Sequence, residues 1–277
     1  MIGQAIEGKV KGMLIVGENP VLSFPSPSAV KEALASLNFL VVTDLFLTET
    51  ARLASVVLPA ASFAEREGTF TNFEGRGQRV QKAIEPHGDS LPDWEIILQL
   101  ANSMGCPMPY SSTQQVMDEI KELVPLYRRP SNIDLVLPKK LQRFSPVKYA
   151  LTKVPTDGYP LALLSGSILH HFGSGARSSR ASRLKKFSPH AWVEISDADA
   201  KHLGLSDGDI VNVVSPVGKV TTAVRVTDSL PPGTLFMPIS FPESPVNELF
   251  GITLDPQAKT PAFKRCAVRL ERISADG

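Results

Sequence analysis

The stretch NFLVVTDLFLTETARLASVVLPAA, residues 38–61, decides the fold class of the amino-terminal part of the chain. It holds two short apolar runs, at 39–42 and 56–58, and the helix-like segment TETARLA separates them. Short runs that are apolar on both faces are typical of parallel strands that helices cover. The stretch therefore predicts strand, helix and strand within one parallel sheet.

Flanking segments extend this alternation over residues 1–104. GMLIVGENP at 12–20 predicts a further buried strand that ends in a turn, and SAVKEALASL at 28–37 predicts an amphipathic helix after it. The polar segment 62–80 predicts a loop with a short hairpin, and PDWEIILQLANSMG at 92–105 predicts a helix. We interpret residues 1–104 as a partial Rossmann-like α/β domain. Its first strand comes almost at the start of the sequence, so we expect a partner polypeptide to complete the sheet.

Residues 105–158 join this domain to a second one of different character. STQQVMDEIKELVP at 112–125 predicts a helix, and the proline-rich, basic segment 127–149 predicts a linker. Over 159–277 the pattern changes to short strands with frequent turns, including two alternating strands joined by a Pro-Val-Gly turn within 209–228. This pattern predicts a small β-barrel.

Composition limits the partners that the chain can have. With 43% hydrophobic and 21% charged residues, the composition is that of a soluble globular protein. The formal net charge of +1 indicates neither a nucleic-acid partner nor an anionic membrane. No apolar run in the sequence is long enough to cross a bilayer or to form the core of a signal peptide. We therefore expect a cytoplasmic protein without direct membrane insertion.

Cysteines and catalytic patterns are scarce. Cys106 and Cys266 lie far apart and form no C-x-x-C motif, so the sequence predicts no cysteine-ligated zinc or iron–sulfur site within this chain. No carboxylate pair and no nucleophile beside a base stands out. The sequence thus predicts no catalytic residues and no metal ligands here, and a redox reaction would depend on another polypeptide.

Several long stretches resemble the molybdopterin oxidoreductases. GMLIVGENP, the run from Val41 to Arg79 and PDWEI resemble the third domain of these enzymes. YPLALLSGSILHHFGSGARSSR at 159–180, WVEISDADAKHLGLSDGDIVNVVSPVGKV at 192–220 and DPQAKTPAFKRCAVRLE at 255–271 resemble the fourth domain, a double-psi-type dinucleotide-binding barrel. The resemblance implies molybdopterin guanine dinucleotide as the cofactor.

Two segments resemble different branches of this family. GCPMPYSSTQQVMDEIKEL at 105–123 resembles formate dehydrogenase catalytic subunits, and FTNFEGRGQR at 70–79 resembles the large iron–sulfur subunit of NADH:quinone oxidoreductases. The first branch implies the carboxy-terminal half of a catalytic subunit, made as a separate chain or as a fragment. The start in mid-domain favours a subunit split over two chains, in which a partner carries the iron–sulfur centre and the ligand of molybdenum or tungsten. Further electron-transfer subunits would join this assembly. The second branch implies a cofactor-free structural module. A free-standing small-molecule-binding protein is a third hypothesis, which requires the half domain to fold alone.

The resemblance also implies a set of cofactor contacts. Asp44 would pair with guanine and Thr43 would line the same pocket, at the carboxyl end of a strand where α/β sheets bind ligands. Helix capping is the alternative role for Asp44 and for Asp93, and Lys264 is either a contact to the pterin or an exposed barrel lysine. The expected contacts are Gly17, Glu18, Asn19, Thr43, Asp44, Thr48, Arg66, Glu67, Gly68, Asp93, Ser165, Gly166, Ser167, Leu169, His170, His171, Gly173, Ser174, Phe241, Asn247 and Lys264.

The adjacent histidines His170 and His171 stand in a run of glycine, serine and arginine. Adjacent side chains on a strand point to opposite faces, so two such histidines do not bind one metal ion without a bend. We therefore expect this run to cradle the dinucleotide. Arg177 and Arg180 either replace a positive charge that relatives carry at the position of Ser167 or are solvated.

Overall fold

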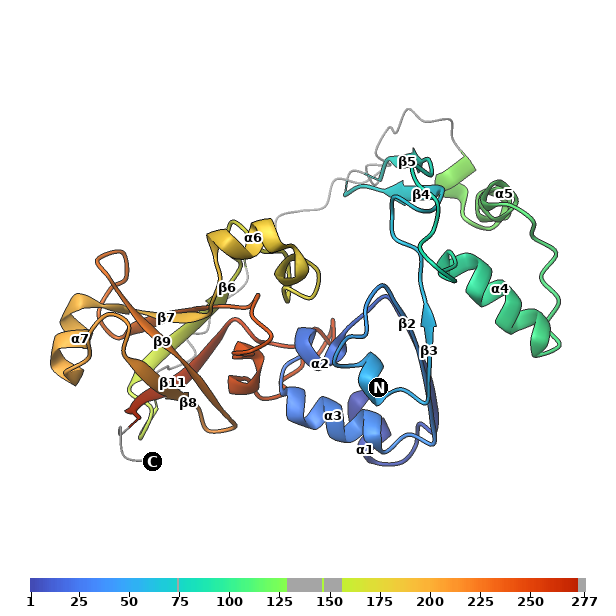
Figure 1. The fold of residues 1–277 in the computed structure, drawn as a ribbon. Helices are drawn as coiled ribbons and strands as arrows, with labels where there is room; N and C mark the ends of the chain where they lie inside the picture. The colour runs from blue at the N-terminus through green and yellow to red at the C-terminus, as the bar shows by residue number, and fades with distance from the viewer. Residues whose placement is uncertain (74, 129–145, 147–155, 274–277) are drawn as a thin grey trace.

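The computed structural model describes residues 1–73, 75–128, 146 and 156–273, so most of the predicted linker lies outside the described residues. An α/β unit and a β-barrel lie side by side, and a hairpin with two further helices extends from the α/β unit (Figure 1). Among the described residues, no helix is long and apolar enough to cross a membrane.

The α/β unit is built on a three-stranded parallel sheet in the order β1-β2-β3, as the sequence predicts. The strands are β1 (Gly12–Val16), β2 (Phe39–Asp44) and β3 (Val56–Pro59). Their helices are α1 (Ile2–Ile6), α2 (Pro20–Ser23), α3 (Pro27–Ala35) and the 3₁₀ turn η1 (Ala51–Leu53). Valine, leucine and isoleucine side chains from β1, β2, α2 and α3 form the core between the sheet and these helices.

Beyond β3 the chain leaves the sheet and forms a separate arm. The arm comprises the antiparallel hairpin of β4 (Gly68–Thr71) and β5 (Gly77–Val80), then α4 (Asp93–Ser103), α5 (Thr113–Leu123) and η2 (Pro125–Arg128). Both helices agree with the sequence prediction. The Ser112 hydroxyl begins α5 by accepting a hydrogen bond from the Gln115 N–H at 3.3 Å.

The second unit is a closed barrel of six strands in the order β10-β6-β11-β8-β9-β7, which confirms the predicted barrel. Its strands are β6 (Leu161–Gly166), β7 (Trp192–Ser196), β8 (Ile210–Val214), β9 (Lys219–Thr227), β10 (Thr234–Pro238) and β11 (Arg265–Arg272). Short helical segments connect them: η3 (Ser178–Arg180), α6 (Ser182–Phe187), α7 (Asp197–Leu203) and η4 (Val246–Leu249). Alternate residues of the strands point inward and form one apolar core.

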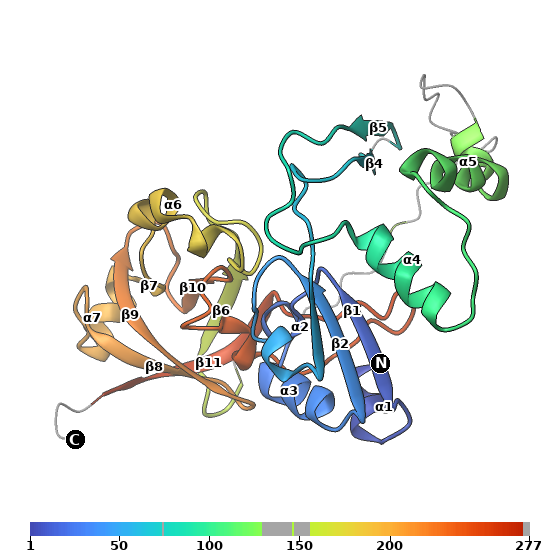
Figure 2. The same cartoon turned by 45° about the vertical axis from the view of Figure 1, so that its right-hand side comes forward.

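The two units contact each other where η4 meets the loop between α2 and α3. The Asn247 side chain donates to the Leu22 carbonyl at 2.8 Å, and the Ser26 N–H donates to the Asn247 carbonyl at 3.0 Å. The Ser28 hydroxyl reaches the Glu248 carboxylate at 3.0 Å. These contacts hold the α/β unit beside the barrel, with α2 and α3 on the side of the sheet that faces the barrel (Figure 2).

Candidate functional site

Two adjoining pockets lie between the carboxyl ends of β1 and β2 and the barrel loop that follows β6. One has a volume of about 340 Å³ and reaches the segment 60–63, and the other has about 300 Å³ and reaches the loop 172–177. Gly17, Asp44 and Arg177 line both pockets. The carboxyl edge of a parallel sheet is where α/β proteins bind ligands, so this is the main candidate site.

Asp44, the last residue of β2, stands in the wall that separates the two pockets. One carboxylate oxygen accepts the Leu45 N–H at 2.7 Å, and the other lies 3.5 Å from the Thr48 hydroxyl. The Thr48 hydroxyl in turn accepts the Ala51 N–H at 3.3 Å. The Asp44 carboxylate therefore stabilises the turn that follows β2. A carboxylate has about four acceptor positions, so this fixed group can still accept hydrogen bonds from a ligand in the pockets.

The conformation of the loop after β1 leaves room for a ligand close to its backbone. Gly17 has φ +62°, a conformation that favours glycine, and a Cβ added there would meet no atom within 4 Å. Asn19 is buried. Its side-chain oxygen accepts a hydrogen bond from the Thr50 hydroxyl at 2.7 Å, and its side-chain NH2 group donates to the Glu49 carboxylate at 2.8 Å. Asn19 thus holds the pocket wall in place through internal hydrogen bonds, and Glu18 beside it accepts from the Ser23 hydroxyl.

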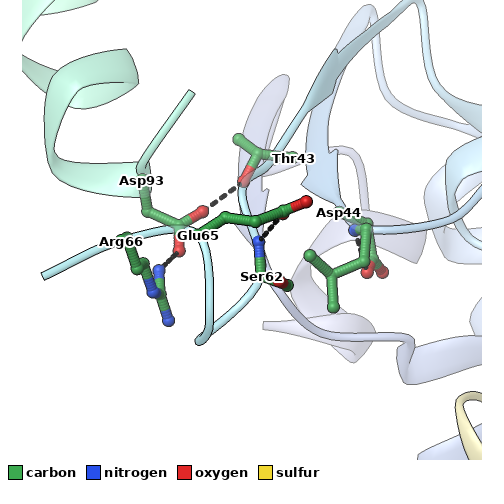
Figure 3. A network of polar contacts seen from close by, with 7 residues as sticks. Thr43, Asp44, Ser62, Glu65, Arg66 and Asp93 are labelled. Atoms are coloured by element: carbon green, nitrogen blue, oxygen red, sulfur yellow. Dashed lines mark hydrogen bonds and ion pairs between the residues drawn. The ribbon is translucent and has the colours of Figure 1, made fainter. Parts of the chain in front are cut away.

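Thr43, Arg66 and Asp93 form a polar network at the edge of the first pocket (Figure 3). The buried Thr43 hydroxyl donates to one Asp93 oxygen at 3.1 Å, and the Arg66 guanidinium forms an ion pair with the other. Pro92 is the N-cap of α4, so Asp93 is the first residue of the helix and not its N-cap. Its carboxylate instead connects β2 to the arm.

Glu65 lies in the loop before β4 and makes a separate contact near this network. Its carboxylate accepts the Ser62 N–H at 2.7 Å, and this hydrogen bond lowers the pKa of Glu65 below its ordinary value (Figure 3). Glu67, by contrast, points toward α5 and accepts from the Thr113 hydroxyl at 3.1 Å. Glu67 and Gly68 thus begin the hairpin and line neither of the two pockets.

The barrel contributes Gly173, Ser174 and Arg177 to the second pocket. This loop is fixed by close packing against the segment after β10. The Ser240 hydroxyl donates to the Gly173 carbonyl at 2.8 Å. Gly175 has φ +78°, and a Cβ there would lie 1.9 Å from the Ser240 carbonyl oxygen, so the loop requires glycine at this position.

His170 and His171 lie beyond β6, which ends at Gly166, and not on a strand. The His171 ring is buried. Its Nε2 atom lies 3.0 Å from the Ser188 carbonyl oxygen, and its Nδ1 atom lies 3.0 Å from the Ser178 hydroxyl oxygen. A carbonyl oxygen accepts and does not donate, so Nε2 carries a proton. Both ring nitrogens are thus partnered inside the protein, and His171 does not face the pockets.

Several other expected contacts also have internal roles. Phe241 is buried against His171 at a ring separation of 5.2 Å, and Asn247 joins the two units. The Ser165 hydroxyl donates to the Phe263 carbonyl at 2.7 Å, and the exposed Lys264 side chain lies over the Phe263 ring. Ser167 and Leu169 are exposed, His170 stacks on Phe187, and Gly166 packs closely on Phe236.

Residues outside the expected set of contacts also line the pockets, and Arg177, Phe46 and Phe172 are among them. Arg177 lines both, forms no ion pair within the described part of the chain, and supplies positive charge there. Phe46 and Phe172 line the second pocket, and the Arg180 guanidinium stacks over the Phe46 ring at 4.7 Å. The sequence has no acidic residue from 158 to 193, and this pattern could have indicated that the arginines supply positive charge to a site. The two phenylalanines belong to no sequence motif.

Two family models match this chain. The model described as "Molybdopterin oxidoreductase" matches residues 1–103, and the one described as "Molydopterin dinucleotide binding domain" matches residues 161–267. The chain belongs to the molybdopterin oxidoreductase family. As a molybdopterin oxidoreductase it carries the binding domain for a molybdopterin guanine dinucleotide. Within the residues that the structure describes, no cluster of three or more histidine, cysteine or acidic side chains could hold a metal ion.

Curated relatives of this molybdopterin oxidoreductase include formate dehydrogenase subunits. The F420-dependent formate dehydrogenase subunit alpha of Methanocaldococcus jannaschii is 37% identical over 95% of this chain and 43% of its own length. Formate dehydrogenase H of Escherichia coli is 32% identical over 98% of this chain and 42% of its own length. The chain thus spans less than half the length of these relatives. Acetylene hydratase from Pelobacter acetylenicus shares the fold, with a TM-score of 0.80 at 20% identity over 98% of this chain and 46% of the solved chain.

The residues at the two pockets fit the guanine dinucleotide of such a cofactor. Asp44 offers acceptors of the kind that the N1–H and amino group of guanine require. Arg177 offers a cation of the kind that a pyrophosphate requires, and Gly17 lets the backbone approach closely. The chemistry of the donors and acceptors therefore agrees with the family.

Proposed function

We propose that this chain is the cofactor-binding portion of a formate dehydrogenase-type catalytic subunit that is split over two chains. The supporting observation is the pair of adjoining pockets whose shared wall comes from both units: Gly17 and Asp44 from the sheet and Arg177 from the barrel. A ligand that fills both pockets contacts both units at once, as an extended dinucleotide does. The names of the matched relatives support formate as the substrate of the whole assembly.

Each wall residue has a distinct task in this proposal. Asp44 accepts hydrogen bonds from guanine, and its fixed position comes from Leu45 and Thr48. Arg177 neutralises phosphate charge, and the loop that carries it is anchored through Gly175. Arg66 and Asp93 line the first pocket, and the Thr43 hydroxyl and the ion pair with Arg66 fix the Asp93 carboxylate, which sets the position of the arm. When bound, the cofactor supplies the molybdenum or tungsten centre at which electrons are transferred.

The proposed partners rest on the likeness to formate dehydrogenase alpha subunits. A second polypeptide would carry the iron–sulfur centre and the metal ligand and would complete the α/β domain, and further electron-transfer subunits would join it. We assign residues 1–104 to the Rossmann-like third domain, 105–158 to a helix and linker, and 159–277 to the double-psi-type fourth domain. Molybdenum or tungsten as the metal and a cytoplasmic location belong to the same proposal.

A cofactor-free structural module of an NADH dehydrogenase-like complex is the second candidate. It is favoured by the internal pairing of several expected contacts, since Asp93 is neutralised by Arg66 and both Asn19 and His171 have internal partners. A scaffold keeps such bonds without needing any ligand. The positive charge of Arg177 at the pockets and the remaining acceptor positions of Asp44 favour the cofactor-binding proposal.

Metal and nucleotide content of the natively purified complex discriminates the two. Molybdenum or tungsten together with guanine released by acid supports cofactor binding, whereas iron without either supports the scaffold. The Asp44→Asn variant keeps an oxygen for the Leu45 N–H but loses the charge that guanine contacts. We expect guanine content to fall by about tenfold or more, since a hydrogen bond to a charged group contributes about 1.5–3 kcal/mol.

The control for this experiment is Asp228→Asn, which changes an exposed carboxylate of the barrel away from both pockets. It should retain the guanine content of the unmodified complex. Equal guanine content in the Asp44→Asn and Asp228→Asn complexes would contradict the role that we propose for Asp44.

A further inference from the structure

The helix α6 lies at the rim of the barrel, and none of its six residues is buried (Figures 1 and 2). Its N-cap, Ala181, makes no side-chain hydrogen bond to the first turn. Helices shorter than about 12 residues are marginal in water, and in proteins they gain most of their stability by packing one face against other residues. Within the part of the chain that the structure describes, α6 has no such buried face. The helix is therefore suited to contact a further molecule.

An exposed aromatic ring ends α6. Phe187 is 68% exposed, although the His170 ring stacks on it with a centroid separation of 4.9 Å. Leu184 is 37% exposed and lies three residues earlier, so the two side chains share one face of the helix. Aromatic side chains are enriched in the buried centre of protein–protein interfaces. Leu184 and Phe187 thus form a short apolar stripe of the kind found at such centres.

Positive charge lies beside this stripe. Arg183, Lys185 and Lys186 are exposed, and none of them forms an ion pair with another described residue. The segment 158–193 holds five lysine and arginine residues and no acidic residue, although the formal net charge of the whole chain is +1. Positive charge is thus concentrated around α6. We call Arg183, Leu184, Lys185, Lys186 and Phe187 the α6 surface.

The stability of the helix does not account for all of this charge. Lys185 and Lys186 lie in the last turn, where the helix dipole favours cations. Arg183 lies in the first turn, where the dipole favours acidic groups. Neither this arginine nor the exposed ring of Phe187 stabilises the helix itself. Both are instead suited to an external partner that brings negative charge and an apolar group.

We propose that the α6 surface binds an acidic face of another subunit of the assembly. This inference rests on the proposed function, in which further subunits join the chain. The partner presents carboxylates opposite Arg183, Lys185 and Lys186, and an apolar side chain opposite Phe187. Complementary charge at the rim sets the orientation of such a contact, and the aromatic ring at its centre contributes to its affinity.

The mixed character of the α6 surface favours a protein over other anions. Nucleic acids are bound mainly through many contacts to phosphates, and anionic lipids through clusters of about four to eight cations. The α6 surface has three cations and places an aliphatic and an aromatic side chain among them. A second copy of this chain would bring the same positive charge to the contact, and like charges repel.

Carbodiimide cross-linking of the native complex tests this contact, because the reagent joins a lysine to a carboxylate that touches it. We expect Lys185 or Lys186 to be joined to an aspartate or glutamate of a different subunit, as mass spectrometry of the linked peptides would show. Lys219 is the matched control, since it is exposed on β9 and lies outside the α6 surface. Cross-links of both α6 lysines to this chain or its second copy alone, or none at all, would overturn the proposal.

Charge reversal gives an independent measure. In the Arg183→Glu/Lys186→Glu variant, repulsion replaces attraction at two positions, so we expect recovery of the complex at low salt to fall by about tenfold or more. Lys219→Glu should leave recovery unchanged, and circular dichroism checks that both variants fold. Equal recovery of the two folded variants would contradict the proposal. So would an intact complex in which the double variant has lost binding to RNA or to anionic lipid vesicles.

This outcome is separable from that of the proposed function. No residue of the α6 surface lines either of the two adjoining pockets, so the double variant leaves their walls unchanged. Guanine and metal content report the cofactor, whereas the carbodiimide cross-links report the partner. A cross-linked complex without guanine would support the α6 contact and remove the cofactor role. A guanine-containing complex without these cross-links would retain the cofactor role and remove the α6 contact.

Discussion

Replacing His171 by phenylalanine should destabilise the barrel while preserving the volume of the buried ring. Phenylalanine can still contact Phe241, but it neither donates to the Ser188 carbonyl nor accepts from the Ser178 hydroxyl. Ser178 and Ser188 are each 8% exposed, so water does not readily replace the lost partner. One buried polar group left unsatisfied costs about 1–3 kcal/mol, and two are affected here. We expect the free energy of unfolding to fall by about 2–6 kcal/mol.

His170→Phe is the matched control for this substitution. His170 stacks on the Phe187 ring with a centroid separation of 4.9 Å, and a phenylalanine ring can make the same contact. The expected change is within about 0.5 kcal/mol, as for most partly exposed substitutions. The same substitution at two adjacent positions is therefore expected to lower the free energy of unfolding by clearly different amounts.

Urea unfolding of the full chain, followed by tryptophan fluorescence, measures both variants. Trp192 lies 5.7 Å from Phe241 and thus reports on the packing around His171. Hydrogen exchange of the loop 172–177 provides a second readout, since the Phe172 N–H donates to the same Ser178 hydroxyl. If both variants unfold at the same urea concentration, the internal role assigned to His171 is refuted.

Three further predictions concern other buried contacts. Burial raises the pKa of the Cys266 thiol to about 12, so iodoacetamide at pH 8 should label the exposed Cys106 and leave Cys266 unmodified until urea is added, as peptide mass spectrometry would show. Gly175→Ala should lower the melting temperature, with a loss of about 3 kcal/mol or more, because its Cβ would overlap the Ser240 carbonyl at φ +78°. Asn247→Leu should speed hydrogen exchange across the contact between the two units, by about tenfold; unchanged exchange would show that this amide does not hold them together.

The fold was largely predictable because apolar periodicity determines it. The run 38–61 predicts two parallel strands, and the structure places both in one sheet. The alternating strands within 209–228 form the β8–β9 hairpin for the same reason. By contrast, His170 and His171 lie outside the strand on which their side chains would alternate, because β6 ends at Gly166.

The part of the candidate site that lies at the ends of strands could be predicted from the sequence. Gly17 and Asp44 follow apolar runs, so the rule that α/β sheets bind ligands at the carboxyl ends of their strands selects both residues. Phe172 and Arg177 enter the pockets from a barrel loop, and contacts between distant segments have no sequence period. His171 has a polar side chain in a glycine-rich run, and sequence alone does not tell a buried hydrogen-bonded ring from a ligand contact.

The shared wall of the two pockets has a thermodynamic consequence. In the proposed binding mode Asp44 and Arg177 come from separate units. A ligand then gains its full set of contacts when the units are docked, so ligand binding and docking are linked equilibria. The covalent connection between the units sets their effective concentration and makes docking independent of protein concentration. Two polypeptides corresponding to the two units would instead bind the dinucleotide with an apparent affinity that rises with the concentration of either one.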